Sequence, residues 1–139
     1  MTPFDTAKAF FHACESLKGW EGCAPYAAAD ASFTAQSQGI ENLSKLSEYA
    51  DWFQGVGNGP LKGCNYVLNA SGFDTETNQA LFFGTFTGTH TGDGGPVPAT
   101  GKSTQSEYVY VMQMNSDGKV SHMTKIWNSP WAFAELGWA

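Results

Sequence analysis

The stretch from residue 88 to residue 138 decides the fold, and it reads GTHTGDGGPVPATGKSTQSEYVYVMQMNSDGKVSHMTKIWNSPWAFAELGW. A strand is expected to end near residues 89–92, where a loop rich in glycine and proline begins. Strands are predicted over 106–114 and 119–127, and Asp117-Gly118 between them is typical of a tight hairpin turn. A short helix is expected to follow, ending at Leu136-Gly137.

Before residue 62, apolar residues recur at the intervals typical of helices. Residues 3–18 predict the first helix, and residues 40–54 predict a second, with a short helical turn over 20–26 and a short strand over 31–36. Residues 55–60, with three glycines and a proline, predict a loop. The buried face of the first helix is assigned to its apolar side chains at helical spacing: Phe4, Ala7, Phe10, Phe11, Cys14 and Leu17.

Further strands are predicted over 64–73 and 79–91, so helices come first and consecutive hairpins follow. This order indicates an α+β fold. Because long meandering strands curl strongly, we expect a cone-shaped barrel in which the N-terminal helices pack in the concave face of a curved, mostly antiparallel sheet. The length of 139 residues fits one domain, 1–139, closed by a short C-terminal helix.

The composition of the chain limits the classes of partner that it is expected to bind. The net charge is −6 and the seven basic residues are scattered lysines, which argues against nucleic acid or an anionic membrane surface. No run is apolar enough to span a bilayer and no signal peptide is recognised, so a soluble, cytoplasmic protein is expected. The three cysteines are interpreted as free thiols, and the three histidines lack metal-ligand spacing, so neither a metal nor a cofactor is expected.

Four short motifs carry a resemblance to a known family: Gly88-Thr-His-Thr-Gly92, Pro98-Ala-Thr-Gly-Lys102, Asp117-Gly-Lys-Val120 and Ala134-Glu-Leu-Gly137. Together with the order of elements, they resemble the nuclear transport factor 2-like (ketosteroid isomerase-like) superfamily, and within it the SnoaL-like polyketide cyclases. The resemblance implies an apolar interior that binds a flat, hydrophobic small molecule, and a homodimer formed through the open face of the sheet.

The resemblance also implies a site on the last two strands. The cyclases use an acid there, and its position in this chain is Lys125, while the positions of the supporting amide and imidazole are Tyr108 and Tyr110. Strand side chains alternate between faces, so Lys125 shares its face with Met123 and Trp127. We therefore predict a catalytic group of Lys125, Tyr110 and Tyr108, with apolar walls from Phe82, Phe86, Met112, Met123 and Trp127.

Desolvation would lower the pKa of a buried Lys125, and a neutral amine can act as a general base or form a Schiff base. The alternative is structural: Lys125 extends to the mouth of the cone or pairs with Glu107 or Glu135. The acidic residues are assigned to helix surfaces, strand entries and turns, and only Asp30 is expected to have a chance of reaching the interior.

Three further residues are candidate ligand contacts: Thr34, Gln36 and His90. Thr34 and Gln36 share one face of the first strand, although so short a run does not decide which face is the inner one. His90 is either a proton relay near the mouth of the cone or a hydrogen-bonding residue that holds the loop over 92–101.

The sequence thus predicts a protein that binds a hydrophobic small molecule, with an acid–base isomerase, dehydratase or cyclase as the catalytic form. A non-catalytic binding, dimerisation or protein-interaction module on the same fold is the alternative.

Overall fold

The computed structural model describes residues 1–139 and contains four α-helices, one short 3₁₀-helix and five strands. None of its helices has the length and apolar character needed to cross a membrane. In chain order the elements are α1 (Pro3–Glu15), α2 (Gly19–Cys23), the 3₁₀-helix (Ala24–Tyr26), β1 (Ala27–Ala35), α3 (Leu46–Asn58), β2 (Asn65–Asp74), β3 (Gln79–Thr89), β4 (Ser103–Met114), β5 (Val120–Trp127) and α4 (Ser129–Leu136).

The five strands form one mixed sheet in the order β1-β5-β4-β3-β2. Three of the four pairings are antiparallel, and β1 joins β5 in parallel. Breaks in register occur between Leu68 and Ala70 on β2 and between Gln113 and Met114 on β4. Bulges of this kind bend a strand and increase its twist, which helps the sheet to curl.

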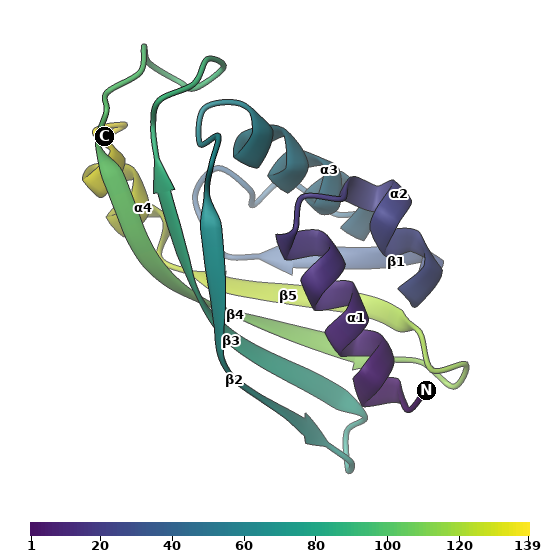
Figure 1. Ribbon diagram of the computed structural model, residues 1–139. Helices are drawn as coiled ribbons and strands as arrows, with labels where there is room; N and C mark the ends of the chain where they lie inside the picture. Colours follow the sequence, from purple (N-terminus) through teal and green to yellow (C-terminus); the bar gives the residue numbers. More distant parts are fainter.

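Helices α1, α2 and α3 lie on the concave side of the sheet, and α4 lies beside the far end of β4 (Figure 1). Aromatic rings fill much of the space between these layers. Phe11 of α1 stacks on Phe82 of β3 at 5.0 Å between ring centroids, and Phe33 of β1 stacks on Tyr49 of α3 at 4.5 Å. The predicted α+β class and cone-like architecture are therefore confirmed, but the interior is mostly packed rather than hollow.

Helix α3 corrects the prediction for residues 40–60. It begins at Leu46, not near residue 40, and continues through Gly55 and Gly57 to Asn58. Glycine costs a helix only about 1 kcal/mol, so two glycines do not end one that is packed. Gly57 also gives room for the α1–α2 connection, because a Cβ atom there would lie 2.4 Å from Cδ2 of Leu17.

Side chains cap the N-terminus of α1. Thr2 and Asp5 form a reciprocal capping box, in which the amide of Asp5 donates to Thr2 Oγ1 and the amide of Thr2 donates to Asp5 Oδ2. The helix ends at Glu15, three residues earlier than predicted, and Leu17 adopts a left-handed conformation with φ of 63°. Glu15, the last residue of the helix, is buried.

Candidate functional site

Glu15 is the functional candidate that the sequence interpretation missed. It is only 4% exposed, whereas it was assigned to the helix surface. Ala7, Phe11 and Glu15 follow one another at intervals of four residues, so all three lie on the same stripe of α1. The stripe was assigned from apolar side chains alone, and a carboxyl group at its last position was therefore overlooked. Asp30, the acid expected to reach the interior, is exposed.

Two phenols from β4 hold the Glu15 carboxyl group. Tyr108 Oη donates to Glu15 Oε2 at 2.5 Å, and Tyr110 Oη donates to Glu15 Oε1 at 2.6 Å. Both tyrosines are buried on the inner face of β4, as the alternation of that strand predicts. The carboxyl group therefore has both oxygens occupied by donors from one strand.

The chain of hydrogen bonds continues from Glu15 to Lys125. Lys125 Nζ donates to Tyr49 Oη at 2.9 Å, and the hydroxyl of Tyr49 is hydrogen-bonded to that of Tyr110. Because the proton of Tyr110 is already donated to Glu15, Tyr49 must donate to Tyr110. Every donor in the chain therefore points in one direction, from the amine of Lys125 toward the carboxyl group of Glu15.

Lys125 is buried, with 5% of its surface exposed, which excludes the proposed position at the mouth of the cone. Its ammonium lies 4.3 Å from the centroid of the Trp127 ring and 5.5 Å from that of Tyr108, within the range of cation–π attraction. It also does not pair with Glu135, which instead accepts hydrogen bonds from Thr104 Oγ1 and the amide of residue 105.

Burial shifts the pKa of each group in this chain toward its neutral form. It lowers the pKa of Lys125 to about 8, although the charge of Glu15 opposes the shift. It raises the pKa of the Glu15 carboxyl group, against the hydrogen bonds from the two phenols and the charge of Lys125. Burial likewise raises the pKa values of Tyr49, Tyr108 and Tyr110, so these phenols stay protonated at neutral pH.

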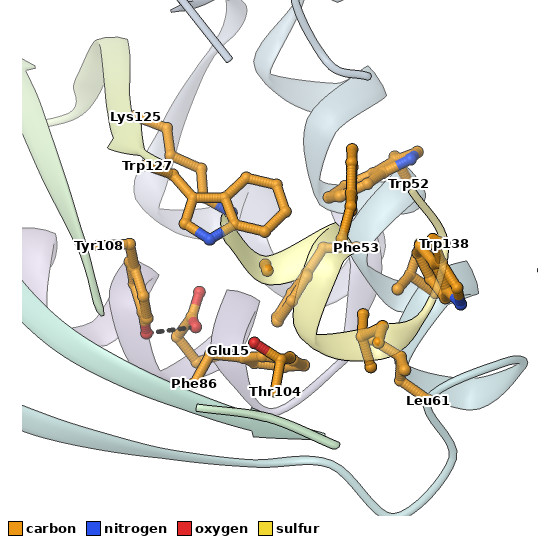
Figure 2. A pocket seen from close by; sticks show the side chains of 14 residues that line it. Glu15, Trp52, Phe53, Leu61, Phe86, Thr104, Tyr108, Lys125, Trp127 and Trp138 are labelled. Atoms are coloured by element: carbon orange, nitrogen blue, oxygen red, sulfur yellow. Dashed lines mark hydrogen bonds between the residues drawn. The ribbon is translucent and has the colours of Figure 1, made fainter. Parts of the chain in front are cut away.

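Glu15, Tyr108 and Lys125 converge on one small cavity of about 40 Å³ (Figure 2). The cavity is large enough to hold water, since about 10–15 Å³ is sufficient for one molecule. Most of its wall is apolar, and its lining consists of Glu15, Trp52, Phe53, Val56, Leu61, Phe86, Thr104, Tyr108, Lys125, Trp127, Ala132, Phe133, Leu136 and Trp138. A few polar groups in an apolar wall are typical of a small-molecule site.

A larger surface depression, of about 420 Å³, lies next to this cavity. Four side chains line both spaces: Trp52, Val56, Phe133 and Trp138. They therefore form the partition between the two spaces.

His90 holds part of this partition in place. It is fully buried, and its Nδ1 accepts a hydrogen bond of 2.8 Å from Trp138 Nε1. Its backbone amide and carbonyl are hydrogen-bonded to Lys102 and Gly101, so it also holds the loop over 92–101. His90 does not line the cavity, and its contacts agree with the structural alternative.

Not all of the predicted ligand contacts reach the cavity. Trp127, Phe86, Tyr108 and Lys125 do, whereas Tyr110 is reached only through its hydrogen bonds. Phe82, Met112 and Met123 are completely buried core residues away from the cavity wall. Thr34 and Gln36 are exposed on the outer face of β1 and just beyond its end, because Phe33 and Ala35 take the inner positions.

Nowhere in residues 1–139 do three or more His, Cys, Asp or Glu side chains gather in a way that could hold a metal ion. The polar side chains that line the cavity are Glu15, Thr104, Tyr108 and Lys125.

We expect the free energy of unfolding to carry a pH dependence that originates at Lys125. Its pKa is about 8 in the folded protein against 10.5 in the unfolded chain, so between these values the unfolded state binds more protons. The Lys125 contribution to stability therefore rises with pH across this window, by at most about 1.4 kcal/mol per unit. Below pH 7 both states are protonated and the contribution is constant.

Urea denaturation of the wild type and of Lys125→Met at pH 7.0, 8.0, 9.0 and 9.5 measures this dependence. The difference between the two proteins isolates the contribution of Lys125 from those of the other titrating groups. Parallel pH profiles for the two proteins would show that the amine is not desolvated.

Comparison with known proteins supports the fold but no closer relationship. No family model matches the chain, and no curated protein matches it by sequence. Among solved structures, an NTF2-like protein of Burkholderia thailandensis covers 97% of both chains with a TM-score of 0.74 at 16% identity. The chain has the NTF2-like, or ketosteroid isomerase-like, fold.

Other proteins with the NTF2-like fold differ in the function attached to them. IdmH of Streptomyces antibioticus, proposed to be a polyketide cyclase, covers 99% of both chains with a TM-score of 0.75 and 16% identity. The pinacolase BvnE of Penicillium brevicompactum covers 97% of this chain and 93% of its own, with a TM-score of 0.71 and 11% identity. The NTF2-like architecture expected from the sequence motifs is confirmed, and at these identities the likeness extends to the fold alone.

Proposed function

We propose that this protein binds a small carbonyl compound in the inner cavity and transfers a proton to or from the carbon next to the carbonyl group. Such a step is common to cofactor-independent isomerases, dehydratases and aldol-type cyclases. One observation supports the proposal most strongly: a buried carboxyl group, a buried phenol and a buried amine meet at the wall of a single apolar cavity.

Each group has a defined role in this proposal. Lys125 has three N–H bonds when charged and uses one of them on Tyr49, so two remain to bind a carbonyl oxygen in the cavity. Glu15 is the base that removes the proton, because a carboxyl group whose pKa is raised by burial accepts protons more readily than an exposed one. Tyr108 keeps the carboxyl group oriented toward the cavity.

The size of the cavity limits the substrate. A volume of about 40 Å³ is far below the roughly 150 Å³ of a cavity that binds benzene, so the cavity suits only a short aliphatic aldehyde or ketone. The flat hydrophobic molecule that the resemblance implies needs more space, so it would require displacement of Trp52, Phe133 or Trp138 into the adjoining depression. Short carbonyl compounds are therefore the appropriate first probes.

Exchange of the α-hydrogens of propanal in D₂O, followed by proton NMR, tests this function. The wild type is expected to accelerate exchange, and Glu15→Gln and Lys125→Met are each expected to reduce the acceleration by about a hundredfold. Lys102→Met, which changes an exposed lysine, is the matched control and should retain it. Equal exchange rates with and without the wild-type protein would contradict the proposal.

The outer face of the sheet favours a second candidate function, a dimerisation or protein-interaction module. Phe83, Val109 and Ile126 lie opposite one another on β3, β4 and β5, and Phe83 and Ile126 are 37% and 59% exposed. An exposed apolar row of this kind is typical of a surface that another protein covers. We propose a homodimer through this face, as the resemblance implies.

Sedimentation equilibrium tests the dimer directly. The wild type is expected to have twice the mass of one chain at micromolar concentration, and Phe83→Lys combined with Ile126→Lys is expected to have the mass of one chain. Lys119→Glu, which changes a half-buried lysine at the end of the β4–β5 turn, provides a control for altered charge. A wild type that is monomeric at all concentrations would exclude the homodimer.

A further inference from the structure

Lys125 is a buried amine at the wall of an apolar cavity, and it has N–H groups without a hydrogen-bond partner. Its only hydrogen bond is to Tyr49, and no carboxylate oxygen lies within the 4.0 Å of an ion pair. A buried lysine that serves only structure is normally paired with an acid. Here the nearest carboxyl group, Glu15, is separated from the amine by the hydroxyl groups of Tyr49 and Tyr110.

The surroundings of the amine favour a neutral, nucleophilic form. Burial lowers the pKa of Lys125 to about 8, so at pH 7 roughly a tenth of the amine is neutral. An exposed lysine has several hundredfold less neutral amine at the same pH. The apolar wall of Trp127, Phe53 and Phe86 also keeps bulk water away, and so it protects a product that water would hydrolyse.

Groups that can move the required protons line the same cavity. Glu15 and Tyr108 are hydrogen-bonded to each other at 2.5 Å and both face the space beside Lys125 (Figure 2). Conversion of the ammonium into an iminium moves two protons from nitrogen to the departing oxygen, which leaves as water. A carboxyl group with a raised pKa can perform both transfers in succession.

We propose that Lys125 Nζ forms a covalent protonated imine with a short aldehyde or ketone in the cavity. The nitrogen lone pair forms a bond to the carbonyl carbon, the carbonyl π electrons move to oxygen, and the oxygen is protonated. After a second protonation the oxygen leaves as water while the C=N bond forms. The overall change converts an ammonium and a carbonyl compound into an iminium and water, so charge and atoms balance.

This inference rests on the proposed function and deepens it, because it specifies how the carbonyl compound is activated. The positive nitrogen of an iminium withdraws electrons from the neighbouring carbon. A proton on that carbon then becomes easier for Glu15 to remove than it is in the free carbonyl compound. The preferred substrate is an unbranched aliphatic carbonyl compound, since eleven of the fourteen side chains around the cavity are hydrophobic.

Reductive trapping tests the imine. The protein is incubated at pH 7 with propanal and sodium cyanoborohydride, digested with chymotrypsin, and analysed by mass spectrometry for propylated lysines. The chain has seven lysines and no arginine, so the six others serve as internal controls. We expect Lys125 to be labelled at least about tenfold faster than the mean of these six, since it holds far more neutral amine.

Two controls keep the result interpretable. The preference for Lys125 should disappear in urea, where all seven amines are solvated, and this comparison does not depend on any variant folding. Lys125→Met should lose the fast label, while Lys102→Met should retain it. Labelling of Lys125 no faster than the other lysines in the folded protein would overturn the inference.

The trapping and exchange experiments separate the inference from the function on which it rests. Accelerated α-hydrogen exchange without fast trapping at Lys125 would refute the imine and leave proton transfer by Glu15 intact. Fast trapping without accelerated exchange would support the imine and refute the proposed proton transfer.

Discussion

Glu15→Ala is expected to lower the free energy of unfolding at pH 7 by about 2–6 kcal/mol, because two buried phenols lose their acceptor and each such loss costs about 1–3 kcal/mol. The change removes the acceptor of Tyr108 and Tyr110, and it also removes the negative charge that favours the Lys125 ammonium through the intervening phenols. Chemical denaturation monitored by tryptophan fluorescence measures the loss. Glu21→Ala, which removes an exposed acid from α2, should change stability by no more than about 0.5 kcal/mol.

The double variant Glu15→Ala/Lys125→Met reveals the cause of that loss. If the uncompensated ammonium is responsible, adding Lys125→Met should recover part of the stability, although Lys125→Met alone destabilises the wild type. Coupling of this sign is expected only for residues that share an interaction network. Purely additive effects would mean that Glu15 and Lys125 do not act on one another through the two phenols.

Gly84→Ala is expected to disturb the site from the opposite strand. Gly84 pairs with Tyr108 across β3 and β4, and a Cβ atom there would lie 2.7 Å from both Cζ and Oη of the phenol. The ring must therefore move away from Glu15 or the strands must separate. We expect a loss of about 1–3 kcal/mol in the free energy of unfolding, together with slower propanal exchange.

Two further variants isolate the effect of Gly84. Gly72→Ala is the matched control, because Gly72 is also a strand glycine and a Cβ atom there meets nothing within 4 Å. The cost of Gly84→Ala should also become small in a Tyr108→Ala background, where the ring is absent. A Gly84→Ala protein with unchanged stability and exchange would show that Tyr108 is free to shift without consequence.

The strands of the site could be predicted because their periodicity is simple. The turn at Asp117-Gly118 sets the register of β4 and β5, and alternation then places Tyr108, Tyr110 and Lys125 on the inner face. For β1 the same alternation was not enough. It places Thr34 and Gln36 on one face, but the sequence of a short strand at the edge of a sheet does not reveal which face meets the core.

The helices were harder to predict, because the residues that a helix buries and the residue at which it ends depend on contacts with other parts of the chain. Glu15 lies four residues after Phe11 on the buried stripe, yet a charged residue at a helix end is normally exposed. Its burial is stabilised by the hydrogen bonds that it accepts from the two phenols of β4. Gly55 and Gly57 indicated a loop, whereas both lie within α3, where Leu17 packs too closely on Gly57 to leave room for a Cβ atom. Both errors arise from contacts between segments far apart in the sequence.

The size of the interior could not be inferred from the sequence at all. Composition showed many aromatic side chains but not whether they line a hollow or fill it. In the structure Phe11 stacks on Phe82 and Phe33 stacks on Tyr49 in the core, and the inner cavity lies where residues of α4 meet α3 and the sheet.

The uniform direction of the hydrogen bonds from Lys125 to Glu15 has a consequence for the charges of the site. If Lys125, Tyr49 and Tyr110 each pass one proton to the next group in the chain, the ammonium and the carboxylate become a neutral amine and a neutral acid. No heavier atom has to move. The reverse shift restores the ions. Protons can therefore move between the amine and the carboxyl group through the two phenols, with no solvent molecule in the path.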